Sequence, residues 1–243
     1  MRLRAGYRAS QRRGVSLKTI ILDIETWTPD WNEGENGWEE GSFAPTAFHE
    51  PVVISWMVAE RTSQRVGSEV ETSFDLGLKS ARVDKTSERI ILEGLRGDFA
   101  NADRLVTWNG RGFDMPVLSC RALFCGIDWA WWQQWRHRFG NYKQALKHYD
   151  LLDQLGDYGA ARGLRQDRVA KLCGLPGKTD IDGSQVHALW ASGKEEERAR
   201  IQRYCEQDVK DLWRIYLRYG KCFFGIPDSV LALAEEATEE TFG

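Results

Sequence analysis

Apolar and polar residues follow two different periods along this chain, one typical of β-strands and one typical of α-helices. Strands are predicted where β-branched and aromatic residues gather between turn residues, over 19–22, 51–60, 65–74 and 104–110. The first of these, Thr19–Leu22, shows no apolar–polar alternation, which is typical of a strand covered on both faces.

Helical periodicity dominates between these strands. Helices are predicted from Ser87 through Phe99, from Pro116 onward, over 166–173 and from about 194 to 219, with an acidic helix or tail after 226. The segments 27–50 and 174–186 show no periodicity and predict loops. Because strands and helices alternate, we expect an α/β fold with a mixed central sheet flanked by helices.

Composition favours one large domain. The chain has 243 residues, of which 42% are hydrophobic and 28% are charged, as is usual for a chain that buries one core. We expect this domain over 17–225, a basic tail over 1–16 and an acidic helix or tail over 226–243. No apolar run reaches the ~18 residues of a membrane helix, and the start lacks the apolar core of a signal peptide. Five cysteines without CxxC spacing favour reduced thiols over disulfides or zinc, so we expect a cytoplasmic protein with no membrane partner.

Charge is unevenly distributed, although the net charge is only −3. Residues 1–18 carry five arginines and one lysine but no acid, whereas 30–40 carry five acids. The net charge excludes binding of nucleic acid through overall basicity. For the basic start, a flexible tail or a start codon placed too early is favoured over weak binding of a polyanion, and an organelle transit peptide has the same composition.

Two carboxylates, Asp23 and Glu25, follow the first strand. Residues two apart in a strand project to the same side, so we expect these side chains to lie together. Their like charges repel, and the pair is costly unless a cation lies between them. Taken alone, a strand end in solvent explains this stretch better than a metal site, since short acidic motifs often match by chance.

Further acids follow a later strand and lie in a late helix. Asp114 comes between the strand ending near Gly110 and the helix starting near Pro116, where ligands gather in open α/β sheets, although Asp is also a common helix cap. Tyr204 and Asp208 are four residues apart in a predicted helix, so both project from one helix face. Each of these residues has an ordinary structural explanation when it is considered alone.

Three short motifs nevertheless occur in a specific order: DxE at 23–25, NGxxFDxP at 109–116 and YxxxD at 204–208. Together they resemble the DEDDy group of DnaQ-like 3′–5′ exonucleases, which have the RNase H-like fold. They are most similar to the predicted exonucleases related to the proofreading domain of family B DNA polymerases. The resemblance extends roughly from Leu17 to Gly225, and the combination is far more specific than any single motif.

This resemblance implies a hydrolase that uses two divalent cations, Mg²⁺ or Mn²⁺. The ligands that it implies are Asp23, Glu25, Asp114 and Asp208, with Tyr204 acting at the attacking water. Carboxylate oxygens suit Mg²⁺ or Mn²⁺ rather than zinc, which prefers nitrogen and sulfur. Two such cations would also offset the repulsion between Asp23 and Glu25.

For the substrate, the resemblance implies single-stranded nucleic acid with a free 3′ end, with DNA favoured over RNA, and it is compatible with a polymerase or repair partner in trans. The implied substrate contacts are Thr26, Asn109, Phe113 and Lys178, although a solvated loop position is the stronger explanation for the lysine. The tryptophan-rich segment 129–135 lies outside the resemblance, and we interpret it as a packing patch rather than a stacking surface for bases. An exoribonuclease and a catalytically silent binding module stay open as alternatives, and the complete carboxylate set argues against the second.

Overall fold

The structure is a computed structural model that describes residues 14–29, 43–136, 147–175 and 181–242. Most of the expected basic tail, and Lys178, lie outside the described residues. The centre is a five-stranded sheet with the strand order β3-β2-β1-β4-β5. The strands are β1 (Val15–Trp27), β2 (Glu50–Val66), β3 (Glu69–Arg82), β4 (Arg104–Thr107) and β5 (His148–Asp150).

Strand β1 lies in the middle of this sheet, antiparallel to β2 and parallel to β4. Its Ile21 is opposite Met57 of β2 and Val106 of β4. β2 and β3 form a long antiparallel hairpin, and β4 and β5 are parallel. The carboxyl ends of β1, β4 and β5 therefore lie at the same edge of a mixed sheet, which is where ligands gather in α/β folds.

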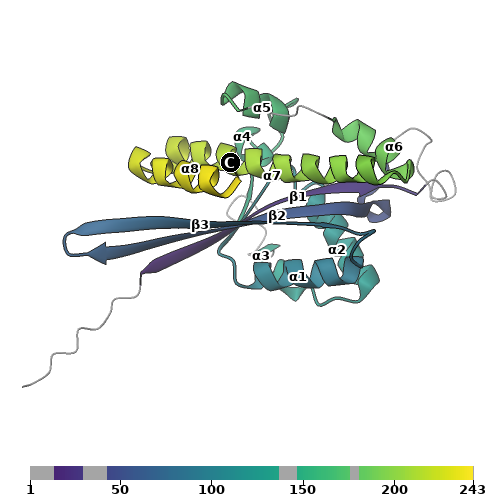
Figure 1. Cartoon of the computed structure of the whole chain (residues 1–243), viewed down its shortest axis with the longest axis horizontal. Coiled ribbons are helices and arrows are strands. Elements are labelled where there is room, and N and C mark those ends of the chain that lie inside the picture. Colours follow the sequence, from purple (N-terminus) through teal and green to yellow (C-terminus); the bar gives the residue numbers. More distant parts are fainter. Residues whose placement is uncertain (1–13, 30–42, 137–146, 176–180, 243) are drawn as a thin grey trace, which may run out of the picture.

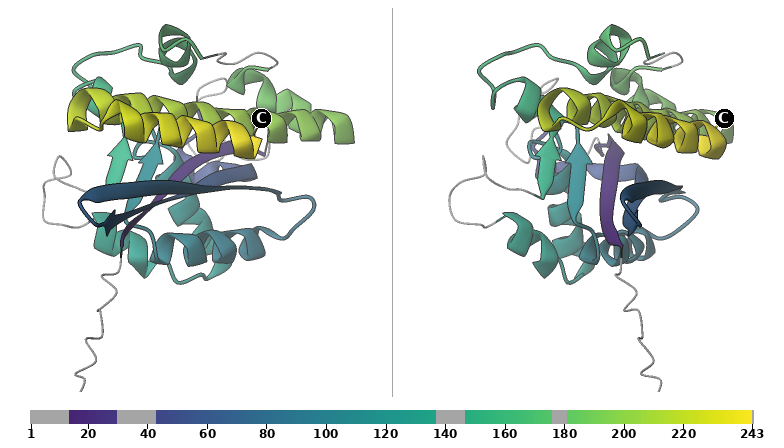
Figure 2. Two further views of the ribbon diagram at one scale, coloured as in Figure 1. Left: turned by 60° about the vertical axis from the view of Figure 1, so that its left-hand side comes forward. Right: turned by 90° about the vertical axis from the view of Figure 1, so that its left-hand side faces the viewer.

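Helices cover both faces of the sheet, so the molecule has three layers (Figures 1 and 2). One layer consists of α1 (Glu88–Ala100), α2 (Asp114–Cys125) and α3 (Ala130–Arg136), and the other contains α7 (Glu195–Phe224) and α8 (Asp228–Phe242). β1 is buried from both sides, which confirms the interpretation of its apolar run.

The side chains of β1 divide between two cores. Ile20 and Leu22 are fully buried in one core with Leu95 and Phe99 of α1. Ile21 points the other way and belongs to a second core with Leu212 of α7. Each fully buried side chain of this size contributes roughly 1.5–3 kcal/mol. The strand is therefore held from both sides, which fixes the position of the residues at its carboxyl end.

Short elements surround this carboxyl end. They are η2 (Thr46–Phe48), α4 (Leu151–Leu155), α5 (Gln166–Leu172), η4 (Gly183–Gln185) and α6 (Val186–Ala191). Figure 1 shows α4, α5 and α6 on the same side of the sheet as α7. Among the helices that the structure describes, none is long and apolar enough to cross a bilayer.

The hairpin of β2 and β3 differs from the expectation. The predicted strand over 65–74 is wrong, because β2 continues to Val66 and β3 begins only at Glu69. Gly67 turns the chain with a φ of 65°, a left-handed conformation that glycine adopts without steric cost. Alternation continues on both sides of this turn, so the apolar pattern alone does not locate it.

Other element boundaries also shift. The expected loop over 27–50 is shorter at its start, since β1 continues to Trp27. Helix α2 begins at Asp114 rather than at Pro116, and α7 continues past 219 to Phe224. In the tryptophan-rich segment, Trp131 stacks on Phe99 with ring centroids 4.6 Å apart, which is a packing position.

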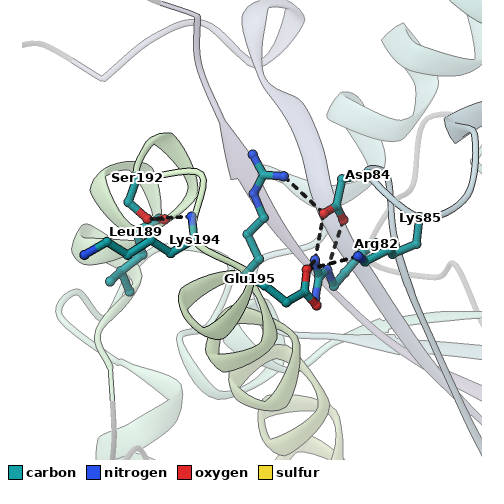
Figure 3. A network of polar contacts seen from close by, with 8 residues as sticks. Arg82, Asp84, Lys85, Leu189, Ser192, Lys194 and Glu195 are labelled. Carbon is teal, nitrogen blue, oxygen red and sulfur yellow. Dashed lines mark hydrogen bonds and ion pairs between the residues drawn. The ribbon is translucent and has the colours of Figure 1, made fainter.

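The start of α7 is fixed to the end of β3 by an ion-pair cluster, which consists of Arg82, Asp84, Lys85, Glu195 and Arg198 (Figure 3). The Arg82 side chain is only 4% exposed, and its guanidinium donates to Glu195 at 2.8 and 2.9 Å and to Asp84 at 2.7 and 3.0 Å. Arg198 donates to Asp84 at 3.1 Å. These hydrogen bonds hold the pKa of Glu195 at about 2 and lower the pKa of Asp84.

Candidate active site

Three carboxylates meet at the carboxyl end of β1. One oxygen each of Asp23, Glu25 and Asp208 lies within 4.8 Å of the others, and we refer to these three residues as the acidic cluster. Asp23 and Glu25 are two apart on β1, and Asp208 faces them from α7. The first two side chains are partly exposed and Asp208 is buried. The structure thus brings together three of the four carboxylates expected from the sequence.

The acidic cluster lines a cavity of about 320 Å³ at the edge of the sheet. Its other walls come from the segment after β4, from α5, from η4 and from α7, and include Trp108, Asn109, Arg165, Gln166, Gly183 and Tyr204. Two further residues expected at the site, Asn109 and Tyr204, therefore share one cavity with the carboxylates. Arg165 adds a positively charged guanidinium to the wall, and this group pairs with Asp182 at 3.3 Å.

Tyr204 and Asp208 lie one turn apart on α7, as their spacing predicted. The Gln166 side chain donates to the backbone carbonyl of Asp208 at 2.8 Å, which joins α5 to this turn. A Cβ on Gly183 would lie 3.7 Å from the Tyr204 hydroxyl, so η4 approaches the phenol closely. Three elements therefore define where the phenol and the carboxylate lie.

A buried thiol contacts the acidic cluster on the side away from the cavity. Cys205 Sγ lies 3.4 Å from the Asp23 carboxylate and 3.4 Å from its backbone carbonyl, so the two oxygens share the one thiol hydrogen. Burial raises the pKa of this thiol well above its usual value, and the charges of Asp23 and Glu25 raise it further. The thiol therefore keeps its proton at neutral pH. Sequence reasoning missed this residue, although its position next to Tyr204 on α7 was a signal that it lies near the site.

The segment that carries Asn109 is shaped by Asp150 at the end of β5. The two Asp150 carboxylate oxygens accept hydrogen bonds from the backbone amides of Asn109 and Arg111, each at 2.8 Å. Asn109 has a φ of 62°, which asparagine tolerates better than most residues. A Cβ on Gly112 would lie 2.6 Å from Asn109 Oδ1, so any other residue there would displace the Asn109 side chain. Sequence reasoning did not identify Asp150, because its role depends on a contact between distant segments.

Asp114 occupies a different position from the other three expected ligands. It is 4% exposed at the start of α2 and lies outside the acidic cluster. Burial raises its pKa to about 7, and the charge of Asp150 acts in the same direction. Backbone amides, including that of Ile24 on β1, hydrogen-bond to its carboxylate and oppose this shift. The carboxylate is therefore close to the strand of the acidic cluster but beneath the protein surface.

The expected substrate contacts separate into two groups. Asn109 lines the cavity of the acidic cluster. Phe113 instead belongs to an aromatic cluster with Phe43 and His49. Thr26 forms a hydrogen bond with the same histidine. Phe43 and His49 were missed by sequence reasoning, because they lie in a segment without periodicity. The expected contact Lys178 lies outside the described residues.

The chemistry of the acidic cluster fits a divalent cation. Its three ligand groups are carboxylates, and hard cations such as Mg²⁺ and Mn²⁺ prefer oxygen ligands. Like charges this close favour a bound cation, because it offsets their mutual repulsion. An oxygen-lined cavity with a phenol beside it is suited to holding a water molecule against a phosphate ester.

Two comparisons with known sequences bear on this site. A family model described as a predicted 3′–5′ exonuclease related to the exonuclease domain of PolB matches residues 41–227. The matched range contains the second and third motifs and begins after the first one, at 23–25. No protein of curated function matches the chain.

Among solved structures, the chain is similar to a family B DNA polymerase from the hyperthermophilic archaeon Pyrobaculum calidifontis, with a TM-score of 0.56 and 20% sequence identity. The similarity covers 84% of this chain and 24% of the polymerase chain. At this identity the similarity shows the fold alone. The fold is RNase H-like, with a mixed five-stranded sheet between layers of helices, as the motifs implied.

Proposed function

Because this chain belongs to the family of predicted 3′–5′ exonucleases related to the exonuclease domain of PolB, we propose that it removes nucleotides from the free 3′ end of single-stranded DNA, with two divalent cations. The products are nucleoside 5′-monophosphates. The observation that carries this proposal is the acidic cluster, with three carboxylates within 4.8 Å of one another, in one cavity with Tyr204. A different arrangement, such as a thiol beside a histidine, would have favoured other chemistry.

The carboxylates hold the cations in this proposal. Asp23 would help to hold both ions, Glu25 and Asp208 would hold the ion that activates the attacking water, and Asp114 would act indirectly on the ion that stabilises the leaving group. The burial of Asp114 supports the indirect contact. When bound, such a pair of ions lowers the pKa of water, screens the phosphate and stabilises the leaving oxygen.

Tyr204 and Glu25 orient the attacking water. The phenol is a hydrogen-bond donor and acceptor at the cavity wall, but a phenol is a poor general base at neutral pH. Its contribution is therefore to fix the direction of attack rather than to remove a proton. The Cys205 thiol holds the Asp23 carboxylate from the buried side, which limits how that carboxylate can rotate.

The preference for a single strand rests on local contacts. A net charge of −3 gives little general attraction for duplex phosphates, so the grip must come from the site itself. Asn109, Phe113, Thr26 and Lys178 are the proposed contacts to the terminal nucleotides. Proofreading for a polymerase or repair complex would then take place in trans, in the cytoplasm.

A digestion panel tests this function. Purified protein is incubated with 5′-labelled single-stranded DNA, blunt duplex DNA, single-stranded RNA and a circular single strand, with Mg²⁺ or Mn²⁺. Product lengths are read on a gel, and metal binding is measured by calorimetric titration. We expect stepwise shortening of the DNA strand from its 3′ end, and EDTA should stop it. Cleavage of a circular single strand would replace this proposal with an endonuclease. Faster digestion of RNA would identify an exoribonuclease. If the protein neither cleaves any strand nor binds metal, it is a silent binding module.

A further inference from the structure

His49 joins two of the proposed substrate contacts, Thr26 and Phe113. The histidine follows η2 and is 6% exposed. Its Nδ1 lies 2.9 Å from Thr26 Oγ1, and its Nε2 lies 3.1 Å from the backbone oxygen of Ala44. The Phe113 ring meets the imidazole at 85°, with centroids 4.9 Å apart. One buried side chain therefore fixes a hydroxyl on one side and an aromatic ring on the other.

The hydrogen bonds of His49 determine where the protons lie. The Ala44 carbonyl only accepts, so His49 Nε2 carries a hydrogen and donates it there. Burial lowers the pKa of His49, which keeps the imidazole neutral at pH 7. Nδ1 then has a lone pair, and Thr26 must donate its one hydroxyl hydrogen to it. The Thr26 oxygen retains lone pairs alone and is therefore an acceptor for any ligand.

Backbone connects this region directly to the cavity of the acidic cluster. Glu25 and Thr26 are consecutive, and the register between β1 and β2 shifts between them. Such a bulge changes the direction of the side chain that follows it. On the other side, Asn109 lines the cavity, and its backbone carbonyl accepts from the Phe113 amide at 2.9 Å. Because backbone joins it to the cavity on both sides, this region is a candidate surface for the sugar and base of a nucleotide whose phosphate lies at the acidic cluster.

We propose that His49 is a positioning residue that holds the Thr26 hydroxyl as an acceptor for the 3′-hydroxyl of the terminal sugar and holds the Phe113 ring for the terminal base. This inference rests on the proposed function, since it assigns the terminal nucleotide to the region beside the acidic cluster. Phe43 is 75% exposed, and its ring centroid lies 5.7 Å from that of Phe113, so it extends the aromatic surface toward solvent. The Thr26 oxygen accepts a hydrogen bond from a 3′-hydroxyl, and a strand that ends without this hydroxyl loses the contact.

Binding measurements test this role without relying on catalysis. The affinity for a fluorescent single strand ending in a 3′-hydroxyl is compared with that for the same strand ending in a 2′,3′-dideoxynucleotide, with Ca²⁺ in place of Mg²⁺ and strand integrity checked on a gel. The wild-type chain should bind the hydroxyl end about tenfold more tightly, as for one well-placed hydrogen bond. Thr26→Val and His49→Phe should each reduce this ratio to near one. His49→Phe keeps a ring beside Phe113 and removes both polar contacts.

Three comparisons separate positioning from general damage. The double variant Thr26→Val/His49→Phe should show the same ratio as either single variant, because both act through one hydrogen bond. His49→Asn places an oxygen near the former Nδ1 and should restore part of the preference. Phe43→Leu should weaken binding of both ends equally and leave the ratio unchanged.

The outcomes also separate this inference from the proposed function. Equal affinity of the wild-type chain for the two ends, or an unchanged ratio in folded His49→Phe, overturns the inference. A clear preference for the hydroxyl end that disappears in both single variants supports it. If that preference holds and no strand is ever digested with Mg²⁺ or Mn²⁺, the exonuclease proposal fails while the assignment of His49 stands.

Discussion

Helix α7 contributes to two clusters of charged side chains that differ in their balance of charge. At its first turn, the ion-pair cluster joins two arginines and a lysine to two carboxylates (Figure 3). Roughly 20 Å further along, by the helical rise from Glu195 to Asp208, the acidic cluster brings three carboxylates within 4.8 Å. One cluster matches opposite charges, and the other gathers like charges.

The two clusters therefore have opposite effects on the folded state. In the ion-pair cluster, hydrogen bonds from Arg82 lower the pKa of Glu195 and of Asp84, so folding favours their charged forms. In the acidic cluster, mutual repulsion makes the charged forms costly until a cation offsets it. The ion-pair cluster has a structural role, because it fixes the start of α7 to the end of β3. Like charges held together do not fix an element in this way, so the acidic cluster indicates a functional site.

The largest effect should come from neutralising one charge in the acidic cluster. Asp23→Asn keeps the size of the side chain, and we expect it to lower exonuclease activity by about a thousandfold or more, since groups acting as one unit cannot replace each other. The same change should raise the stability of the metal-free protein by about 1 kcal/mol, because it removes repulsion. Steady-state digestion and urea unfolding in EDTA measure the two effects.

Asp75→Asn is the matched control for this change, since Asp75 is exposed on β3. It should leave both activity and stability unchanged. If Asp23→Asn instead destabilises the metal-free protein and remains active, the acidic cluster is a structural feature and the contrast with the ion-pair cluster disappears.

The ion-pair cluster should respond in the opposite way. Arg82→Met keeps the aliphatic part of the side chain but leaves Asp84 with Arg198 alone and Glu195 with Lys85 alone, and we expect a loss of about 2 kcal/mol in the free energy of unfolding at pH 7. Lys85→Met, at a side chain that is 57% exposed, should cost less than about 0.5 kcal/mol. Digestion activity should remain in both variants at temperatures where they are folded.

Acid titration sharpens this prediction. The pKa of Glu195 falls from 4.5 to about 2 in the folded chain, and that of Asp84 is lowered from 3.8. Carboxyls with a lowered folded pKa stabilise the protein above their unfolded pKa, and this contribution is lost as the pH falls toward the folded pKa. Wild-type stability should therefore decrease between pH 4.5 and pH 2, and the decrease should be smaller in Arg82→Met. Parallel decreases in the two proteins would show that Arg82 does not cause these shifts.

A smaller effect is expected at Tyr204, which faces the acidic cluster without carrying its charge. Tyr204→Phe removes one hydroxyl and should lower kcat by about a hundredfold, as is typical for one hydrogen bond that acts in the transition state. Metal binding and thermal stability should stay close to wild type, because no carboxylate is lost. Calorimetric titration with Mn²⁺, together with digestion kinetics, separates the two. Wild-type turnover in Tyr204→Phe would remove the phenol from the mechanism.

The same two clusters show what the sequence could predict. The apolar run of β1 and the long periodicity of α7 predicted both elements, and the i,i+4 spacing placed Tyr204 and Asp208 on one face. These signals are local and extend over many residues. Motif order then predicted that Asp23 and Glu25 would meet Asp208, although no local property requires that contact.

Other features depend on contacts that no local pattern reveals. β5 has three residues and α6 has six, which is too short for periodicity to identify them. The position of Asp114 depends on the Ile24 amide, which hydrogen-bonds to its carboxylate, and the role of His49 depends on its approach to Thr26. Arg82 and Glu195 are 113 positions apart, so their pairing could not be predicted from spacing.

The smallest effect should come from Cys205, which contacts the acidic cluster without facing the cavity. Its thiol lies 3.4 Å from the Asp23 carboxylate, so Cys205→Ala removes a donor and leaves that side chain freer to rotate. We expect about a tenfold loss in activity or Mn²⁺ affinity, as is usual for groups that orient a ligand. Cys205→Ser keeps a donor and should retain most of both, whereas Cys222→Ala at the exposed end of α7 should change neither. If the Ala and Ser variants behave alike, the thiol fills space under β1 and does not orient the carboxylate.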